Sequence, residues 1–428
     1  MTSLRELTAS ARAELPAAGL ARWASIFFSL SVLMFLLSLA AAQALLAAAS
    51  VAYAAHLLRD RPPIKFLPIK VPLALFCLTT LISLWFAANP TAGWFVVRKL
   101  VLFLILLLAV NLIVSAVHLV TLYRALFLES ALAGLVATGQ FVRQYRTVRA
   151  LHPDRIYLYM TSERITGFMG HWMNFGGQQM LVFAALLAFL LLGARLAAVD
   201  AKPRLVWWAI LGIVTLSVVL NFTRGVWLGC FVATVYLVGR SRPRWLWALP
   251  VLLLAGYLLA PSLVRRRVNI LRHPSSDPSL AIRFEMWNVA LRMVRKHPWV
   301  GVGPNNIEQV YLLYLPPGTR PVVGYHEHLH SDFLQFGAER GLPCLLAWVW
   351  LMMALVWHAW RIRRSLARSH RATWLADATI AAWLAFMAEG WFEFNFGTSP
   401  VLIVFLFVVA TPFVVERSFS ANRFVSRS

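Results

Sequence analysis

Long apolar runs recur along nearly the whole chain and constrain its fold more than any other feature. A representative run is LVFAALLAFLLLG at 181–193, and 60% of the 428 residues are hydrophobic while 13% are charged. A helix needs about 20 predominantly apolar residues to span the hydrocarbon core of a bilayer. A spanning β-barrel would instead show short segments of alternating hydrophobicity. The sequence therefore predicts an all-α polytopic membrane protein.

The apolar runs predict about twelve spanning helices, which returns both ends of the chain to one side. The expected spans are 20–38, 40–57, 70–88, 97–114, 117–138, 176–194, 204–220, 225–239, 245–260, 341–360, 373–390 and 398–415. Residues 1–260 would hold nine spans and a short outer segment near 140–175. A large outer loop at 261–340 would follow, and residues 341–428 would hold the last three spans and a tail.

The basic residues orient the expected bundle. The chain has 40 Lys and Arg against 17 Asp and Glu, a formal net charge of +23. Compact basic clusters fall at 59–65, 194–204, 240–244 and 361–371, whereas the short loop at 87–93 is uncharged. Because basic residues concentrate in cytoplasmic loops, both termini are predicted to be cytoplasmic. The arginines of the two long outer segments then form either a solvated surface or, as we favour, a site for an anionic substrate.

A further arginine, Arg224, occurs in the turn NFTRG just before an apolar run. An arginine at that depth is costly unless it is paired or reaches water. It could extend to the lipid headgroups, or it could bind phosphate through its planar fork of donors. The N-terminus of the following helix would add unpaired N–H groups and a favourable dipole.

Arg164 lies in the glycine-rich segment SERITGFMGHWMNFGGQQM at 162–180, which also contains Asn174. The glycines let backbone approach a ligand closely, and Asn174 offers a neutral hydrogen-bonding group near the outer end of a span. The alternative is a flexible re-entrant loop. The glycine spacing is not a nucleotide fingerprint, because no strand precedes it.

The outer loop contains a predicted amphipathic helix, LAIRFEMWNVALRMVRKHP at 280–298. Helical spacing aligns one apolar stripe, made of Leu280, Phe284, Trp287, Leu291 and Val294. Such a helix would lie on the membrane surface or cap the bundle, and Pro298 would end it. Arg283 falls off the stripe, either on a solvated face or at a substrate.

The stretch HEHLHSDF at 326–333 is the densest group of titratable side chains. Alternate histidines share one face of an extended segment, so His326, His328 and His330 could bind a metal ion. However, no HExxH helix or cysteine partner accompanies them. The stretch could also be a polar helix edge, or neutral His330 could act as a general base. Ser331 would cap the next helix, with Asp332 in its first turn.

These residues together resemble the O-antigen ligase family of bacterial inner membranes, within the wider group of lipid-linked oligosaccharide ligases and polymerases. The matching segments are RITGFMGHWMNFGGQQM, NFTRGVWLG, IRFEMWNVALRMVRKHPWVGVGPNN and HEHLHSDFLQFGAERGLP. The resemblance implies a GT-C-like glycosyltransferase with a large helical periplasmic loop. Such an enzyme transfers O-antigen glycan from undecaprenyl diphosphate to lipid A–core at the periplasmic face of the inner membrane.

The resemblance also implies roles for individual residues. Arg224 and Arg283 would hold the diphosphate, His330 would be the base, and Arg164 matches a further basic position less securely. Asp332, Asn174, His326 and His328 are expected to contact or orient substrate. No metal, cofactor or nucleic acid is expected; the partners are the lipid-linked donor, the lipid acceptor and membrane lipids. Alternatives are an O-antigen polymerase, a protein O-oligosaccharyltransferase, or a transporter of the same lipid.

Overall fold

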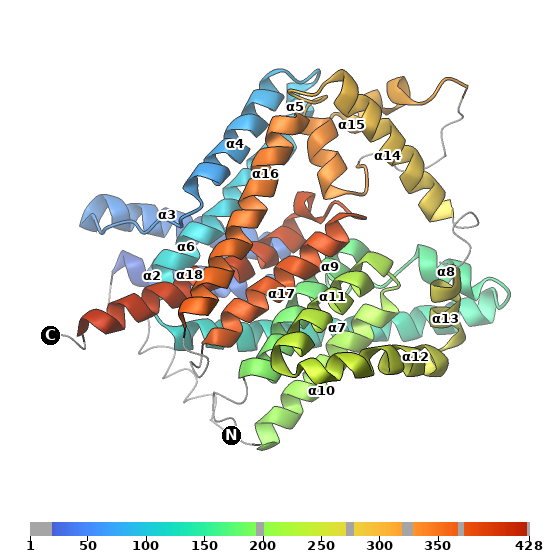
Figure 1. Cartoon of the computed structure of the whole chain (residues 1–428), viewed down its shortest axis with the longest axis horizontal. Coiled ribbons are helices and arrows are strands. Elements are labelled where there is room, and N and C mark those ends of the chain that lie inside the picture. Colours follow the sequence, from blue (N-terminus) through green and yellow to red (C-terminus); the bar gives the residue numbers. More distant parts are fainter. Residues whose placement is uncertain (1–18, 194–200, 271–277, 319–327, 367–371, 426–428) are drawn as a thin grey trace.

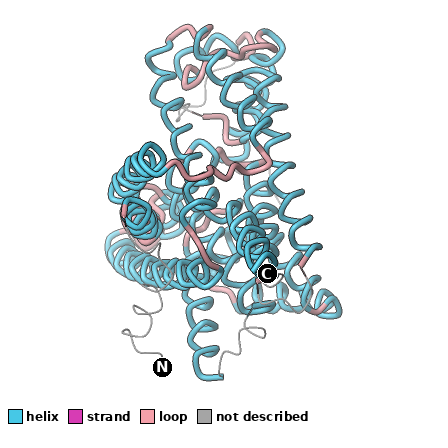
Figure 2. Tube along the Cα trace, turned by 90° about the vertical axis from the view of Figure 1, so that its left-hand side faces the viewer, coloured by secondary structure: helices cyan, strands magenta, loops and turns pink. Residues whose placement is uncertain are grey.

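The computed structural model describes residues 19–193, 201–270, 278–318, 328–366 and 372–425, and this part of the chain is helical without a strand (Figures 1 and 2). The α-helices are α2 (Leu20–Val32), α3 (Leu39–Asp60), α4 (Lys70–Trp85), α5 (Pro90–Val97), α6 (Leu104–Leu112), α7 (Ala116–Leu151), α8 (Ile156–Ser162), α9 (Trp172–Ala188), α10 (Ala201–Leu220), α11 (Arg224–Ser241), α12 (Leu249–Leu259), α13 (Ser262–Asn269), α14 (Pro278–Lys296), α15 (Ile307–Val310), α16 (Asp332–Ser365), α17 (Thr373–Gly390) and α18 (Ser399–Val425). Short 3-10 or π segments are η1 (Arg98–Phe103), η2 (Phe189–Gly193), η3 (Pro243–Ala248), η6 (Tyr311–Tyr314) and η7 (Asn395–Gly397).

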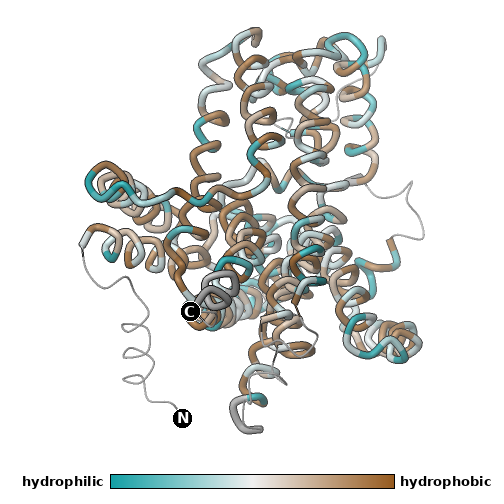
Figure 3. Tube along the Cα trace, turned by 60° about the vertical axis from the view of Figure 1, so that its left-hand side comes forward, coloured by the Kyte–Doolittle hydropathy of each residue, from teal (hydrophilic) through white to brown (hydrophobic). Residues whose placement is uncertain are grey.

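The apolar character of these helices confirms a helical membrane protein. Within the described residues, six helical stretches are long and apolar enough to cross a bilayer, and four more are apolar but shorter. Figure 3 shows hydrophobic residues along most of the helices, with hydrophilic stretches mostly near helix ends. A helix lies at each of the twelve expected spans, but the expected number of twelve membrane crossings is not confirmed.

Helix α17 is the centre of the bundle. It packs against α9, α11, α16 and α18, and most of its residues are buried. It also carries Asp377, whose buried carboxylate accepts hydrogen bonds from Tyr236 on α11 and pairs with Arg363 on α16. Because the buried helix α17 ends at Gly390, the short segment after it is held beside α14 and the loop before α16.

Helix α16 is interrupted near its start by a break in the helical backbone at Gly341. Gly341 has φ +83° and ψ 168°, which only glycine adopts readily. The backbone of 298–303 lies alongside the break: Val302 N–H donates to Ala338 O at 3.0 Å, and Leu342 N–H donates to Pro298 O at 2.7 Å. The first turns of α16 thus form a separate helical piece that carries the residues after His330.

Helix α14 forms where the sequence predicts it, but its packing face differs from the expected stripe. The buried residues are Met286, Val289, Ala290 and Met293, which pack in a cluster with residues of the 302–338 region. Two members of the expected stripe, Phe284 and Leu291, are exposed. The interpretation of one apolar stripe is therefore wrong: methionine and alanine complete a second apolar face, and that face packs against α16.

Candidate active site

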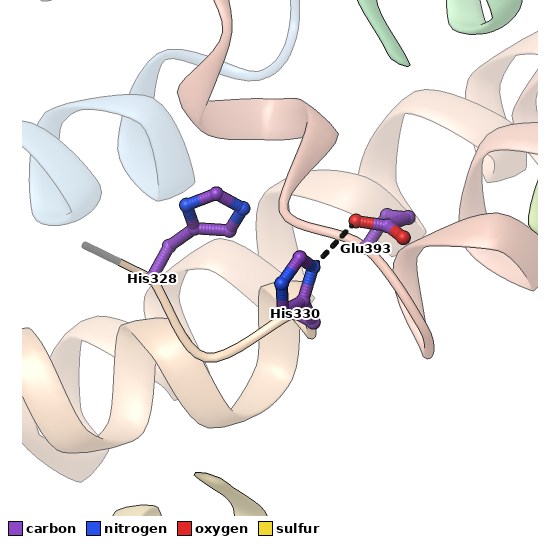
Figure 4. A group of neighbouring side chains, drawn as sticks. All are labelled: His328, His330 and Glu393. Atoms are coloured by element: carbon purple, nitrogen blue, oxygen red, sulfur yellow. Dashed lines mark hydrogen bonds and ion pairs between the residues drawn. The ribbon is translucent and has the colours of Figure 1, made fainter. Parts of the chain in front are cut away.

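A single carboxylate, Glu393, joins two residues that the sequence placed in separate motifs. Nδ1 of His330 lies 2.8 Å from Glu393 Oε2 (Figure 4). The Arg283 guanidinium forms a hydrogen-bonded ion pair with Oε1 of the same carboxylate. The Glu393 side chain is 2% exposed, and those of Arg283 and His330 are each 18% exposed. Three elements thus meet at one carboxylate: α14, the loop before α16 and the segment after α17.

The turn before α16 sets the direction of the His330 ring. His330 has φ +47°, the left-handed region that non-glycine residues rarely occupy. Ser331 follows as the N-cap of α16, with its hydroxyl accepting from the Leu334 N–H, as the sequence predicts. A strained residue locked between a packed loop and a helix start is held in one orientation.

Electrostatics at Glu393 fix the tautomer of His330. Burial alone would raise the pKa of Glu393, but Arg283 and the hydrogen bond from His330 outweigh it and hold the pKa at about 2. An ionised carboxylate can only accept, so Nδ1 of His330 carries the donated hydrogen. In the neutral imidazole, Nε2 then keeps a lone pair that can accept a proton.

The NFTRG turn lies beside the same carboxylate. A Cβ added at Gly225 would lie 3.1 Å from Glu389 Cγ and 3.9 Å from Glu393 Cγ, so Arg224 begins α11 next to these acids. Phe222 has φ +55°, and its carbonyl accepts a hydrogen bond from Nε of Arg267 at 3.2 Å. A second strained turn therefore presents arginine toward the site.

Arg164 closes the basic side of the site. Its guanidinium donates to Thr223 Oγ1 at 3.2 Å and lies over the Trp172 ring at 5.3 Å. Burial, with Arg267 next in effect, lowers the pKa of Arg164 to about 10, and Arg283 and Arg224 act in the same direction. Arg164 therefore lies within the electrostatic reach of three other arginines.

In this region four arginines outnumber the three carboxylates, which are those of Asp332, Glu389 and Glu393. Guanidinium groups this close repel one another, and each is suited to forked contacts with phosphate oxygens. The dipole at the start of α11 adds to the positive potential. The arrangement is thus complementary to a multiply charged anion.

A cavity of about 340 Å³ lies beside His328 and Glu393. Its lining also includes His171 and Asn174, and it extends to Lys99 on η1, whereas His330 does not line it. The Oδ1 atom of Asn174 is buried and makes no hydrogen bond to the described residues. Burial and neighbouring His330 lower the pKa of His328 to about 4, so His328 is neutral at pH 7. The cavity wall is thus polar but mostly uncharged, which suits sugar hydroxyls.

The last two expected site residues are Asp332 and His326. Asp332 is fully buried, and its Oδ1 accepts a hydrogen bond from the Phe396 N–H at 3.1 Å, which ties α16 to η7. Asp332 does not line the cavity that contains His328 and Glu393. This position fits a residue that orients the loop after α17, and its contact with substrate stays a prediction. His326 lies outside the described residues.

The metal interpretation can be weighed from geometry. His328, His330 and Glu393 place one potential ligand atom each within 4.8 Å of one another. However, one oxygen of Glu393 is paired with Arg283 and the other accepts from His330. A divalent cation would have to displace the hydrogen bond and sit beside a guanidinium. The donor set is therefore better suited to orienting His330 than to holding a metal.

Sequence reasoning missed Glu393 and Arg267. Glu393 is the one acidic residue of WFEFNFG, an aromatic link between two apolar runs, and that isolation was an available signal. Arg267 is 8% exposed, whereas its neighbours Arg265 and Arg266 are exposed. It follows Leu263 by four residues and Val264 by three, so it shares their inward face of α13.

The comparison with known families addresses the region that holds most of this site. Residues 209–349 match the family model described as O-Antigen ligase. The resemblance to the O-antigen ligase family is confirmed. The matched segment contains Arg224, Arg267, Arg283 and His330, whereas Arg164 and Glu393 lie outside it. No curated protein sequence matches the chain. This match supports glycan transfer of the ligase or polymerase type in lipopolysaccharide synthesis.

Proposed function

We propose that this protein is an O-antigen ligase of the bacterial inner membrane, with a GT-C-like fold, a periplasmic site and cytoplasmic termini. It transfers O-antigen glycan from undecaprenyl diphosphate to lipid A–core. The observation that carries the proposal is the junction at Glu393, which holds Arg283 and His330 on one carboxylate between a basic cluster and a polar cavity.

The donor diphosphate is assigned to the basic side. Arg224, Arg283 and Arg164 would contact its oxygens, with Arg267 supporting the NFTRG turn. Charge develops on the departing diphosphate in the transition state, and preorganised donors in a water-poor site stabilise it well. A diphosphate is already an activated leaving group, so the reaction needs no nucleotide and no metal.

His330 is the general base. Its Nε2 takes the proton of the acceptor hydroxyl as that oxygen attacks the anomeric carbon, and Glu393 stabilises the imidazolium that forms. The bond between the anomeric carbon and the diphosphate oxygen breaks in the same step. A single displacement inverts the anomeric centre, and retention in an NMR analysis of the product linkage would exclude this mechanism.

The test is transfer by the purified protein, supplied with undecaprenyl-diphosphate-linked O-antigen and rough lipopolysaccharide in the presence of EDTA. A ladder on the lipopolysaccharide is expected. Longer lipid-linked chains without a ladder would identify a polymerase, and transfer to a protein would identify an O-oligosaccharyltransferase. Activity lost in EDTA and restored by a metal ion would overturn metal independence.

A further inference from the structure

A largely apolar groove adjoins the polar cavity of the candidate active site. A cavity of about 720 Å³ lies between α3 and η1, lined by apolar residues of both elements, including Leu46, Val51 and Leu102. Arg98 and Lys99 also line it, together with Ser399. The groove therefore combines a long apolar wall with a compact cationic end.

Lys99 connects this groove to the site. Its side chain lines both the groove and the polar cavity that contains His328 and Glu393, and its ammonium donates to Gly397 O at 2.6 Å. Thr398 lines the cavity and the next residue, Ser399, lines the groove. A lipid in the groove would thus direct its headgroup into the cavity lined by His328 and Glu393.

A second apolar cavity, of about 580 Å³, lies along the same segment. It is lined by residues 66–74 together with η1 and α6, and it shares Val101 and Leu104 with the groove. The 3-10 geometry of η1 interrupts the helix Pro90–Leu112 between these two spaces. Paired apolar cavities suit a lipid with several acyl chains better than a lipid with one polyprenyl chain.

We infer that the groove between α3 and η1 binds an acyl chain of the phosphorylated acceptor lipid, with Arg98 and Lys99 facing its anionic headgroup. The inference rests on the proposed function and specifies how the acceptor approaches. Donor and acceptor then reach His330 from opposite sides: the diphosphate from the arginine cluster and the acceptor from Lys99. The donor diphosphate and the acceptor headgroup therefore bind different cationic residues and do not compete with each other.

The groove is tested by filling it. Ala47 is exposed on α3 and lines the groove, whereas Ala44 is exposed on the same helix and lines none of the cavities described above. Ala47→Trp should raise the KM for rough lipopolysaccharide about tenfold, the effect of losing burial for about two methylene groups. The KM for the lipid-linked donor should not change, and Ala44→Trp should leave both constants unchanged.

The role of Arg98 is tested by measuring binding of phosphorylated and dephosphorylated rough lipopolysaccharide to the unsubstituted protein and to Arg98→Gln. Removing the lipid A phosphates should weaken binding of rough lipopolysaccharide to the unsubstituted protein in nanodiscs. In Arg98→Gln that difference should shrink, because the guanidinium no longer pairs with the phosphate. Arg59→Gln, an exposed arginine of α3, is the charge control and should preserve the difference.

The outcomes separate this inference from the proposed function. A raised donor KM in Ala47→Trp, or an unchanged acceptor KM, would overturn the groove assignment while the ladder assay with unsubstituted protein still supports ligation. Absence of a ladder from the unsubstituted protein would instead overturn the ligase proposal. Equal retention of rough lipopolysaccharide and ordinary phospholipid by the groove would also reject the inference, because the groove would then bind membrane lipid only.

Discussion

Nδ1 of His330 and Oε2 of Glu393 lie 2.8 Å apart, although 63 residues separate them in the chain. The contact explains how a histidine in a left-handed turn keeps one tautomer and one direction. Because Glu393 also pairs with Arg283, any change in this carboxylate acts on His330 and on Arg283 together.

Replacing Glu393 with glutamine should lower kcat sharply. The amide keeps the shape but cannot stabilise an imidazolium, and it can offer its NH₂ group to His330 and favour the wrong tautomer. Losses of about 10² to 10⁴ in kcat are expected for an impaired general base. Steady-state transfer assays at saturating donor would measure this, with the exposed Glu308→Gln as the control. A kcat within threefold of the unsubstituted protein would remove Glu393 from the mechanism.

His330→Ala should abolish base catalysis to a similar degree, about 10² to 10⁴ in kcat, with normal amounts of folded protein in the membrane. His152→Ala, an exposed histidine after α7, is the matched control and should transfer normally. Full activity of His330→Ala would assign the base to another residue.

Arg283→Lys tests whether the fork of the guanidinium matters beyond its charge. Lysine keeps the cation, but its ammonium is a single point and cannot pair with Glu393 and the diphosphate in the same planar geometry. We expect kcat/KM for the donor to fall by about 10- to 100-fold, the effect of about 1.4 to 3 kcal/mol of lost charge-assisted hydrogen bonding. An unchanged value for Arg283→Lys, with loss only in Arg283→Gln, would mean that charge alone is needed.

Local sequence patterns predicted the helices and the side of the candidate site that contains His330. The expected span 373–390 coincides with α17, and Ser331 caps α16 as expected, because apolar periodicity and capping are local properties. The partner of His330 could not be assigned in this way. Glu393 reaches it only because α17 packs in the bundle centre and ends beside the outer loop.

Two other differences have physical causes. Helix α14 carries apolar residues on two faces, so spacing alone could not decide which face packs; the cluster around Met286 and Val289 does. The number of spans is equally hard to read, since α17 is buried by other helices and carries Asp377 and Glu389 within an apolar stretch. Burial by protein and burial by lipid leave the same apolar signal in a sequence.

His328 should make the folded protein sensitive to mild acid. Its pKa of about 4 lies below the value of about 6.5 expected in the unfolded chain, so the unfolded state binds more protons between these values. Stability therefore falls as the pH drops from about 6.5 toward 4. Glu393, with a pKa of about 2, contributes stability above pH 4 and loses it only as the pH falls through about 2.

Thermal unfolding in detergent at pH 7 and pH 5 measures this sensitivity. His328→Gln should show a smaller decrease in Tm between the two pH values, because glutamine does not titrate. The exposed His152→Gln should keep the full decrease. Identical decreases in all three proteins would mean that His328 is not held neutral by its surroundings.

The break in α16 should be intolerant of any side chain. A Cβ on Gly341 would lie 2.4 Å from the carbonyl oxygen of Trp299, and the φ of +83° is strained for an L-residue. Gly341→Ala should therefore destabilise the protein by about 1–3 kcal/mol or more. The expected readout is a lower Tm together with a lower kcat, since the break positions the piece of α16 that follows His330.

Gly139 in α7 has no atom within 4 Å of an added Cβ, so Gly139→Ala should be neutral or slightly stabilising, by up to about 1 kcal/mol. Equal Tm values for the two variants would show that the backbone of α16 can relax around a methyl group, and that the His330 turn does not depend on the conformation of Gly341.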